Sequence, residues 1–152
     1  MKNLEKLLDQ FESRIPLFEN ENIAISKSNV GWHIEHSLLT LNGVTKFLVH
    51  SNPKDYKWKF NFIRILVLKT RKIPRGRAKA PKVVVPTITI DELSLLNHIT
   101  QTRNSLLELE IISKDHYFEH PFFGKIKRND TIRFLEIHTN HHLEIIEDII
   151  KS

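Results

Sequence analysis

The chain has 152 residues, of which 40% are hydrophobic. This is the size of one globular domain, and it is large enough to bury a hydrophobic core without disulfides or a structural metal. It contains no cysteine, so disulfides, zinc–thiolate sites, iron–sulfur clusters and thiol nucleophiles are excluded, and any metal must be bound by nitrogen or oxygen. The net charge is +5, and seven Lys or Arg residues with no acid fall within residues 69–82.

The first half of the chain predicts two helices. Leucine and phenylalanine recur at helical spacing from Leu4 to Phe18, which predicts a helix over residues 2–19. A second apolar run follows Ser28 and Asn29, either of which is a suitable N-cap, and ends near Pro53. No apolar run reaches membrane-spanning length and the N-terminus lacks a secretory pattern, so we expect a soluble, cytoplasmic protein with no membrane partner.

The second half predicts more helices joined by long loops. Residues 54–70 favour a shorter helix, although their apolar core would also suit a strand, and residues 72–86 predict an irregular loop. The sequence TIDE at residues 89–92 has capping-box spacing and starts a third long helix. A second loop over residues 115–128 should end at Asn129 or Asp130, which caps the last helix. We therefore expect an all-α fold, a four-helix bundle with an additional short helix, as one domain over residues 1–152.

The last helix has two histidines on its apolar face. Leu135, His138, His142, Ile145 and Ile149 are three or four residues apart, so their side chains share one face. A buried imidazole without a partner costs about 1–3 kcal/mol, and one shared cation would satisfy both rings. The alternative is a pair of core histidines, each hydrogen-bonded to a group on another helix.

A third ligand should come from a facing helix, and the sequence WHIEH at residues 32–36 offers two candidates. His36 shares a face with Trp32 and Phe47, whereas His33 shares one with Val30 and Val44. Both faces are apolar enough to be buried, so spacing does not choose between the two histidines. The chain has no H-E-x-x-H motif, P-loop or G-x-S-x-G motif, which removes the sequence basis for a zincin, a nucleotide hydrolase or a serine hydrolase.

These pieces resemble the DinB/YfiT-like superfamily. HTNHH at residues 138–142 is similar to the H-x-x-H-H signature of its last helix, and SNVGWHIEHSLLTL at residues 28–41 is similar to its second helix. RGRAKAPK at residues 75–82 and HPFFGKI at residues 120–126 resemble one uncharacterised DinB-related subfamily. The resemblance implies a four-helix bundle in which His36, His138 and His142 bind one divalent ion, and it suggests a homodimer.

The expected function is that of a metal-dependent hydrolase or thiol-dependent transferase acting on a small molecule. Zinc, nickel and iron all accept nitrogen ligands, so the ligand type does not identify the metal. The sequence identifies no catalytic residue. Many superfamily members have R-G-Q after the histidine pair, where this chain has Leu143-Glu144-Ile145, so the activity of known thiol transferases does not carry over. One alternative is a non-catalytic nucleic-acid or anion-binding module that uses the basic loop over residues 69–82, and another is a bundle with purely structural histidines or a structural ion.

Two further sets of residues are candidates for the site. Residues that could line a pocket or orient a ligand are Trp32, His33, Glu35, Tyr117, His120 and His141, although Glu35 is expected to face solvent or pair with a cation. The basic loop offers Arg71, Lys72, Arg75, Arg77, Lys79 and Lys82. These residues favour attraction of an anionic substrate over nucleic-acid binding, because the loop contains no aromatic residue on which a base could stack.

Overall fold

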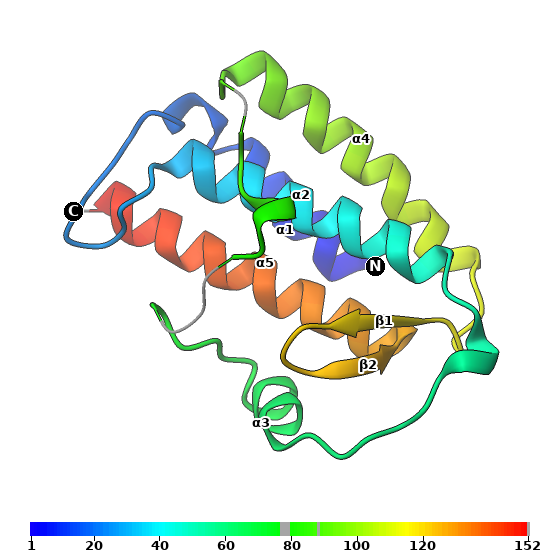
Figure 1. The fold of residues 1–152 in the computed structure, drawn as a ribbon. Coiled ribbons are helices and arrows are strands. Elements are labelled where there is room, and N and C mark those ends of the chain that lie inside the picture. The colour runs from blue at the N-terminus through cyan, green and yellow to red at the C-terminus, as the bar shows by residue number, and fades with distance from the viewer. Residues whose placement is uncertain (77–79, 88, 152) are drawn as a thin grey trace.

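The computed structural model describes residues 1–76, 80–87 and 89–151, and in these the chain is mostly helical (Figure 1). The five α-helices are α1 (Lys2–Glu12), α2 (Val30–Val49), α3 (Phe62–Thr70), α4 (Glu92–Ile111) and α5 (Arg128–Lys151). The strands β1 (Tyr117–His120) and β2 (Gly124–Lys127) pair as a two-stranded sheet, and short 3₁₀ turns form at Ile15–Leu17, Pro53–Asp55 and Lys82–Val84.

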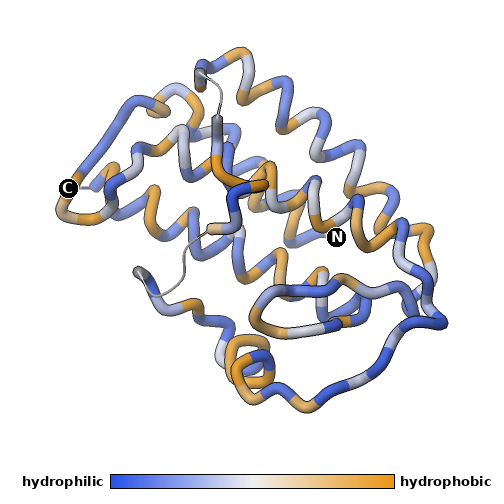
Figure 2. The backbone as a smooth tube through the Cα atoms, viewed as in Figure 1, coloured by the Kyte–Doolittle hydropathy of each residue, from blue (hydrophilic) through white to orange (hydrophobic). Residues whose placement is uncertain are grey.

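The helix α2 is central to the packing. It contacts both α4 and α5, and α1 contacts these same two helices (Figure 1). Buried apolar residues from Leu4 in α1 to Ile149 in α5 form a single hydrophobic core, and apolar and polar residues alternate along the long helices (Figure 2). No helix in the described ranges has the length and apolar character needed to cross a membrane.

The start of α2 agrees with the sequence pattern, and α4 starts with a capping box close to the predicted one. Asn29 caps α2, because its side chain accepts a hydrogen bond from the backbone N–H of Trp32 at 2.9 Å. At the start of α4, Asp91 and Ser94 exchange the two hydrogen bonds of a capping box, two residues later than the Thr89–Glu92 spacing predicts. The long loop between α3 and α4 is irregular in its described residues, as expected, apart from the Lys82–Val84 turn.

Two predicted helices are shorter than expected. The first ends at Glu12 instead of residue 19, because Pro16 has no N–H to donate to the carbonyl of Glu12. The helix predicted over residues 54–70 begins only at Phe62, where the Asn61 side chain accepts from the backbone N–H of Arg64 at 2.9 Å. Residues 56–61 before it lie outside any helix.

The loop predicted over residues 115–128 is wrong, because it contains the β1–β2 hairpin. Tyr117 pairs with Lys127 and His120 pairs with Gly124, whose φ of 66° is easily reached by glycine. The Nδ1 atom of His120 accepts hydrogen bonds from the N–H groups of Phe122 and Phe123, which stabilises the turn. Since β2 runs directly into α5 at Arg128, the expected caps at Asn129 and Asp130 are inside the helix.

Candidate metal centre

The structure brings three histidines from two helices together. His36 lies on α2, and His138 and His142 lie one turn apart on α5. Each offers a ring nitrogen, and these nitrogens all lie within 4.8 Å of one another, so the group could hold a metal ion. We refer to these three residues as the histidine triad. The spacing of residues along the sequence did not decide whether His33 or His36 is the third ligand. The structure places His36 in the triad.

His36 is held by groups on both sides of its ring. Its Nδ1 atom lies 2.8 Å from the carbonyl oxygen of Val84, which can only accept, so Nδ1 carries the hydrogen and the lone pair is on Nε2. Trp32 stacks on the ring with centroids 4.9 Å apart and planes 10° from parallel. The Lys82–Val84 turn thus orients His36, although a backbone carbonyl in a loop leaves no signal in the sequence.

His142 is connected to His33. Their Nδ1 atoms lie 3.0 Å apart, and the Nε2 atom of His33 lies 2.9 Å from the hydroxyl of Ser26, in the segment before α2. His33 is 4% exposed and His142 is 8% exposed, so water does not replace these bonds. His33, predicted as a possible pocket residue, therefore contacts a triad member directly.

His138 has a nitrogen that the surrounding protein leaves without a partner. Its Nδ1 atom is buried, and no hydrogen-bond partner for it is found in the part of the chain that the structure describes. The rings of His36, His142 and Phe134 surround it at centroid distances of 5.2, 4.6 and 5.7 Å. An unpartnered buried nitrogen costs about 1–3 kcal/mol, and a bound cation would remove that cost.

Burial keeps the triad in the neutral form that binds metals. Desolvation lowers the pKa of His36, and it lowers the pKa of His138 and of His142 well below 6.5, with neighbouring histidines adding to the shift in these two. Desolvation, followed by the charges of His36, His141 and Arg75, lowers the pKa of His33 to about 4. At neutral pH the rings are therefore unprotonated and their lone pairs are available.

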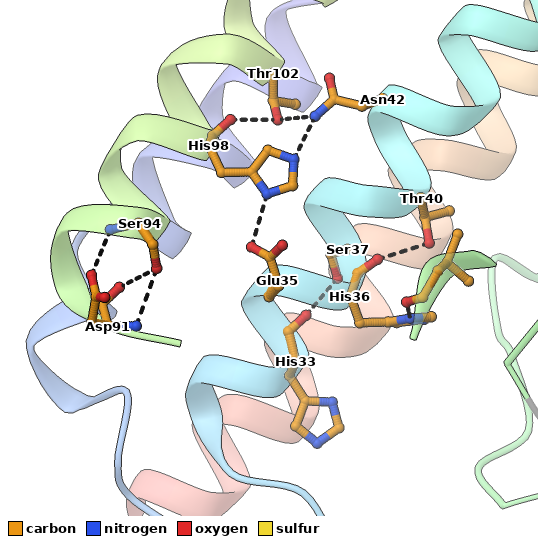
Figure 3. A network of polar contacts seen from close by, with 11 residues as sticks. His33, Glu35, His36, Ser37, Thr40, Asn42, Asp91, Ser94, His98 and Thr102 are labelled. Carbon is orange, nitrogen blue, oxygen red and sulfur yellow. Dashed lines mark hydrogen bonds and ion pairs between the residues drawn. The ribbon is translucent and has the colours of Figure 1, made fainter. Parts of the chain in front are cut away.

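Glu35 does not orient a triad histidine. It is 5% exposed instead of solvent-facing, and its carboxylate accepts a hydrogen bond from Nδ1 of His98 on α4 at 2.8 Å. Figure 3 shows the two side chains pointing toward each other, with Asn42 bonded to the other nitrogen of His98 at 2.8 Å. This polar network joins α2 to α4, and the sequence patterns did not reveal it because its members come from two distant helices.

Of the other predicted pocket residues, His141 contacts a triad histidine, His120 contacts a neighbour of the triad, and Tyr117 contacts neither. His141 contacts the ring of His142 at a centroid distance of 5.3 Å, and burial lowers its pKa. His120 packs against Phe134, the neighbour of His138, with ring centroids 4.6 Å apart. Tyr117 contacts Tyr56 and the ammonium group of Lys125 instead, so it is not part of the triad's surroundings.

The basic loop is partly neutralised by α5. Arg71 forms an ion pair with Glu136 at 3.3 Å, and Arg75 forms one with Asp148 at 2.8 Å. Lys72 and Lys82 are exposed, and Arg77 and Lys79 lie outside the described residues. The charge of Arg75 lowers the pKa of both His33 and His141, and the carbonyl oxygen of Val84 brings the end of the loop to His36.

Comparison with known proteins finds a family model that matches the chain. A family model described as "Protein of unknown function (DUF1569)" matches residues 59–149. The matched range contains His138, His142 and Val84, whereas His33 and His36 precede it. No curated protein and no solved structure matches the chain significantly.

Proposed function

The chain belongs to the DUF1569 family of proteins of unknown function, and we propose that it binds one divalent metal ion through His36, His138 and His142. The observation that carries this proposal is the convergence of three histidine nitrogens within 4.8 Å of one another. The buried, unpartnered Nδ1 of His138 supports it independently.

The donor set fits a metal that keeps an open position. Three neutral imidazoles are the ligands of many catalytic zinc sites, and nickel and iron accept the same ligands. Nitrogens on one tetrahedral zinc ion lie about 3.4 Å apart, since each bond is about 2.0–2.1 Å long. The nitrogens of the triad lie within 4.8 Å of one another, so they need to approach by up to about 1.5 Å to bind one ion.

The arrangement also supports a four-helix bundle of the DinB/YfiT-like type. In that proposal α1, α2, α4 and α5 are the bundle helices and α3 is the additional short one. The packing of α2 against α4 and α5, and of α1 against the same two helices, supports it. So does the division of the triad, with one histidine on α2 and an i, i+4 pair on α5.

We propose a metal-dependent reaction on a small molecule, either hydrolysis or transfer of a thiol to an electrophile. A bound ion with an open position would supply an activated water or thiol, or polarise a carbonyl. Around it, Val84 and His33 would orient two of the ligand rings, and the exposed Lys72 and Lys82 of the basic loop would attract an anionic substrate. The ion pairs of Arg71 and Arg75 with α5 make nucleic-acid binding by the basic loop the weaker alternative.

Metal content tests the proposal directly. We expect the wild-type protein to retain about one equivalent of zinc, nickel or iron after gel filtration, measured by elemental analysis, and the His138→Ala variant to lose it. The His50→Ala variant, which removes an exposed histidine at the end of α2, is the matched control and should keep the metal. A His138→Ala protein that still binds one equivalent contradicts the site.

A second measurement separates catalysis from a purely structural ion. Chelation should abolish turnover of thioester, amide or epoxide test substrates, and re-addition of the metal should restore it. If chelation only lowers the melting temperature, and the metal-loaded protein converts none of these substrates, the ion is structural and the enzymatic part of the proposal is wrong.

A further inference from the structure

The segment from Trp58 to Leu66 exposes an unusual number of large apolar side chains. Trp58, Phe60 and Phe62 are 64%, 68% and 65% exposed, and Ile63 and Leu66 are 54% and 48% exposed. The segment includes most of α3, which lies at the edge of the fold (Figure 1) and carries a concentration of apolar residues there (Figure 2). Contiguous apolar surface of this kind marks an interaction site.

Polar anchors hold this segment in place. Arg64 is 6% exposed, and its guanidinium donates to the carbonyl oxygens of Lys59, Phe123 and Lys125 at 2.7, 3.4 and 3.3 Å. The side chain of Asn61 caps α3 and donates to the carbonyl oxygen of Phe122 at 2.9 Å. The buried polar contacts thus fix the backbone, and the apolar side chains are presented outward by the fold itself.

All charged residues in the sequence around these apolar side chains are positive. Lys57, Lys59, Lys69 and Lys72 are all exposed, and no Asp or Glu occurs from Tyr56 to Ala80. Lys57 and Lys59 alternate with Trp58 and Phe60 in the sequence. In space, Lys69, Lys125 and Arg133 line one pocket together with Trp58 and Ile65, and the single acid Asp130 leaves this lining with a positive balance. The occupant of this surface must therefore offer both apolar area and negative charge.

We infer that this surface, formed by residues 57–69, binds the face of an anionic lipid bilayer. Aromatic and aliphatic side chains beside lysines are the composition of segments that lie in the membrane interface, where the rings enter the headgroup region and the lysines contact anionic headgroups. Such binding needs no spanning helix. The sequence-based expectation of no membrane partner considered only spanning and secretory segments.

The composition favours lipid over two other occupants. Single-stranded nucleic acids stack on aromatic rings, but here the exposed aliphatic residues Ile63, Ile65 and Leu66 equal the exposed aromatic ones in number. A second copy of this chain would bring the lysines of both copies to one interface, where their like charges repel. An anionic bilayer complements both the apolar and the positive character.

Vesicle flotation tests the inference. The full-length protein should float with vesicles of equimolar phosphatidylcholine and phosphatidylglycerol, bind vesicles of phosphatidylcholine alone at least about tenfold more weakly, and dissociate at high salt. The emission of Trp58 should shift to the blue on binding. The Trp58→Phe variant, which keeps Trp32, should show no shift.

Two double variants identify the surface. Phe60→Ala with Phe62→Ala should weaken vesicle binding at least about tenfold, because two exposed rings no longer enter the interface. Lys57→Gln with Lys59→Gln should weaken it about 25-fold, at roughly fivefold for each charge near an anionic surface. The matched controls are Leu107→Ala with Ile111→Ala, 60% and 84% exposed on α4, and Lys2→Gln with Lys46→Gln, and both should bind as wild type does.

Several results would overturn the inference. They are no binding to anionic vesicles, equal loss of binding in the test and control variants, and a wild-type dimer that the Phe60→Ala, Phe62→Ala variant converts to a monomer. Retention on a single-stranded oligonucleotide without vesicle binding would assign the surface to nucleic acid instead. Circular dichroism should give the same helical content for every variant, since the altered side chains are exposed.

Discussion

The Nδ1 atoms of His33 and His142 lie 3.0 Å apart, so one ring donates its hydrogen to the other. If His142 donates, its Nε2 lone pair is free for a metal ion, and His33 carries its own hydrogen on Nε2. That hydrogen points to the hydroxyl of Ser26 at 2.9 Å, which also accepts from the N–H of Ser28 at 3.1 Å. This assignment gives both ring nitrogens of His33 and the Nδ1 atom of His142 a partner, and it makes His33 a positioning residue for His142.

The His33→Phe variant tests this role. The substitution keeps an aromatic ring of similar size but removes the acceptor for Nδ1 of His142, so both the ring orientation and its tautomer are no longer fixed. We expect metal affinity to fall about 10–100-fold, measured by competition with a chromophoric chelator, while about one equivalent still binds at high metal concentration. The His50→Phe variant should keep wild-type affinity, and equal affinities in all three proteins would contradict the role of His33.

The buried pair of Glu35 and His98 should support stability without affecting the metal. Glu35→Ala leaves His98 and Asn42 with incomplete hydrogen bonding between α2 and α4, and we expect a loss of about 1–3 kcal/mol in the free energy of unfolding. Glu136→Ala is the matched control, because its partner Arg71 is 53% exposed, and it should cost less than about 1 kcal/mol. Reduced metal affinity in Glu35→Ala would instead link this pair to the site.

Local patterns predicted those parts of the structure that depend on local spacing. The i, i+4 spacing of His138 and His142 puts both on one face of α5 whatever the rest of the chain does. Asn29 and the α4 capping region start their helices through contacts within four residues. These features need no knowledge of the tertiary fold, which is why the sequence alone predicted them.

The features that depend on distant contacts were not predictable in the same way. His33 and His36 are three residues apart, so both can face α5, and only the packing shows which of them approaches His138. The hairpin depends on the hydrogen bonds from the turn to His120, in a sequence whose proline and glycine favour a loop. The carbonyl of Val84 reaches His36 from a long loop whose path no spacing argument describes.

Two glycines of α2 should respond differently to alanine. Apart from its chain neighbours and the backbone of α2 itself, no heavy atom of the described residues lies within 4 Å of the position that a Cβ would take at Gly43, so Gly43→Ala should raise the free energy of unfolding by about 0.5–1 kcal/mol through helix propensity. At Gly31 the added Cβ would lie 3.1 Å from the carbonyl oxygen of Phe18. This oxygen belongs to the backbone, so it cannot easily move away from the added methyl group. Urea denaturation should therefore give a higher free energy of unfolding for Gly43→Ala than for Gly31→Ala. The reverse order would contradict this packing argument.

His120 should make the protein less stable in acid. Burial lowers its pKa from 6.5 to about 4, so the unfolded chain takes up a proton before the folded one does as the pH falls through this range. His120→Asn keeps an acceptor for the turn N–H groups and removes the titration. Between pH 6.5 and about 4, its free energy of unfolding should fall less steeply than that of wild type, by up to about 1.4 kcal/mol per pH unit. Urea denaturation at a series of pH values measures this difference, and parallel pH profiles for the two proteins would show that His120 is protonated equally in the folded and unfolded states.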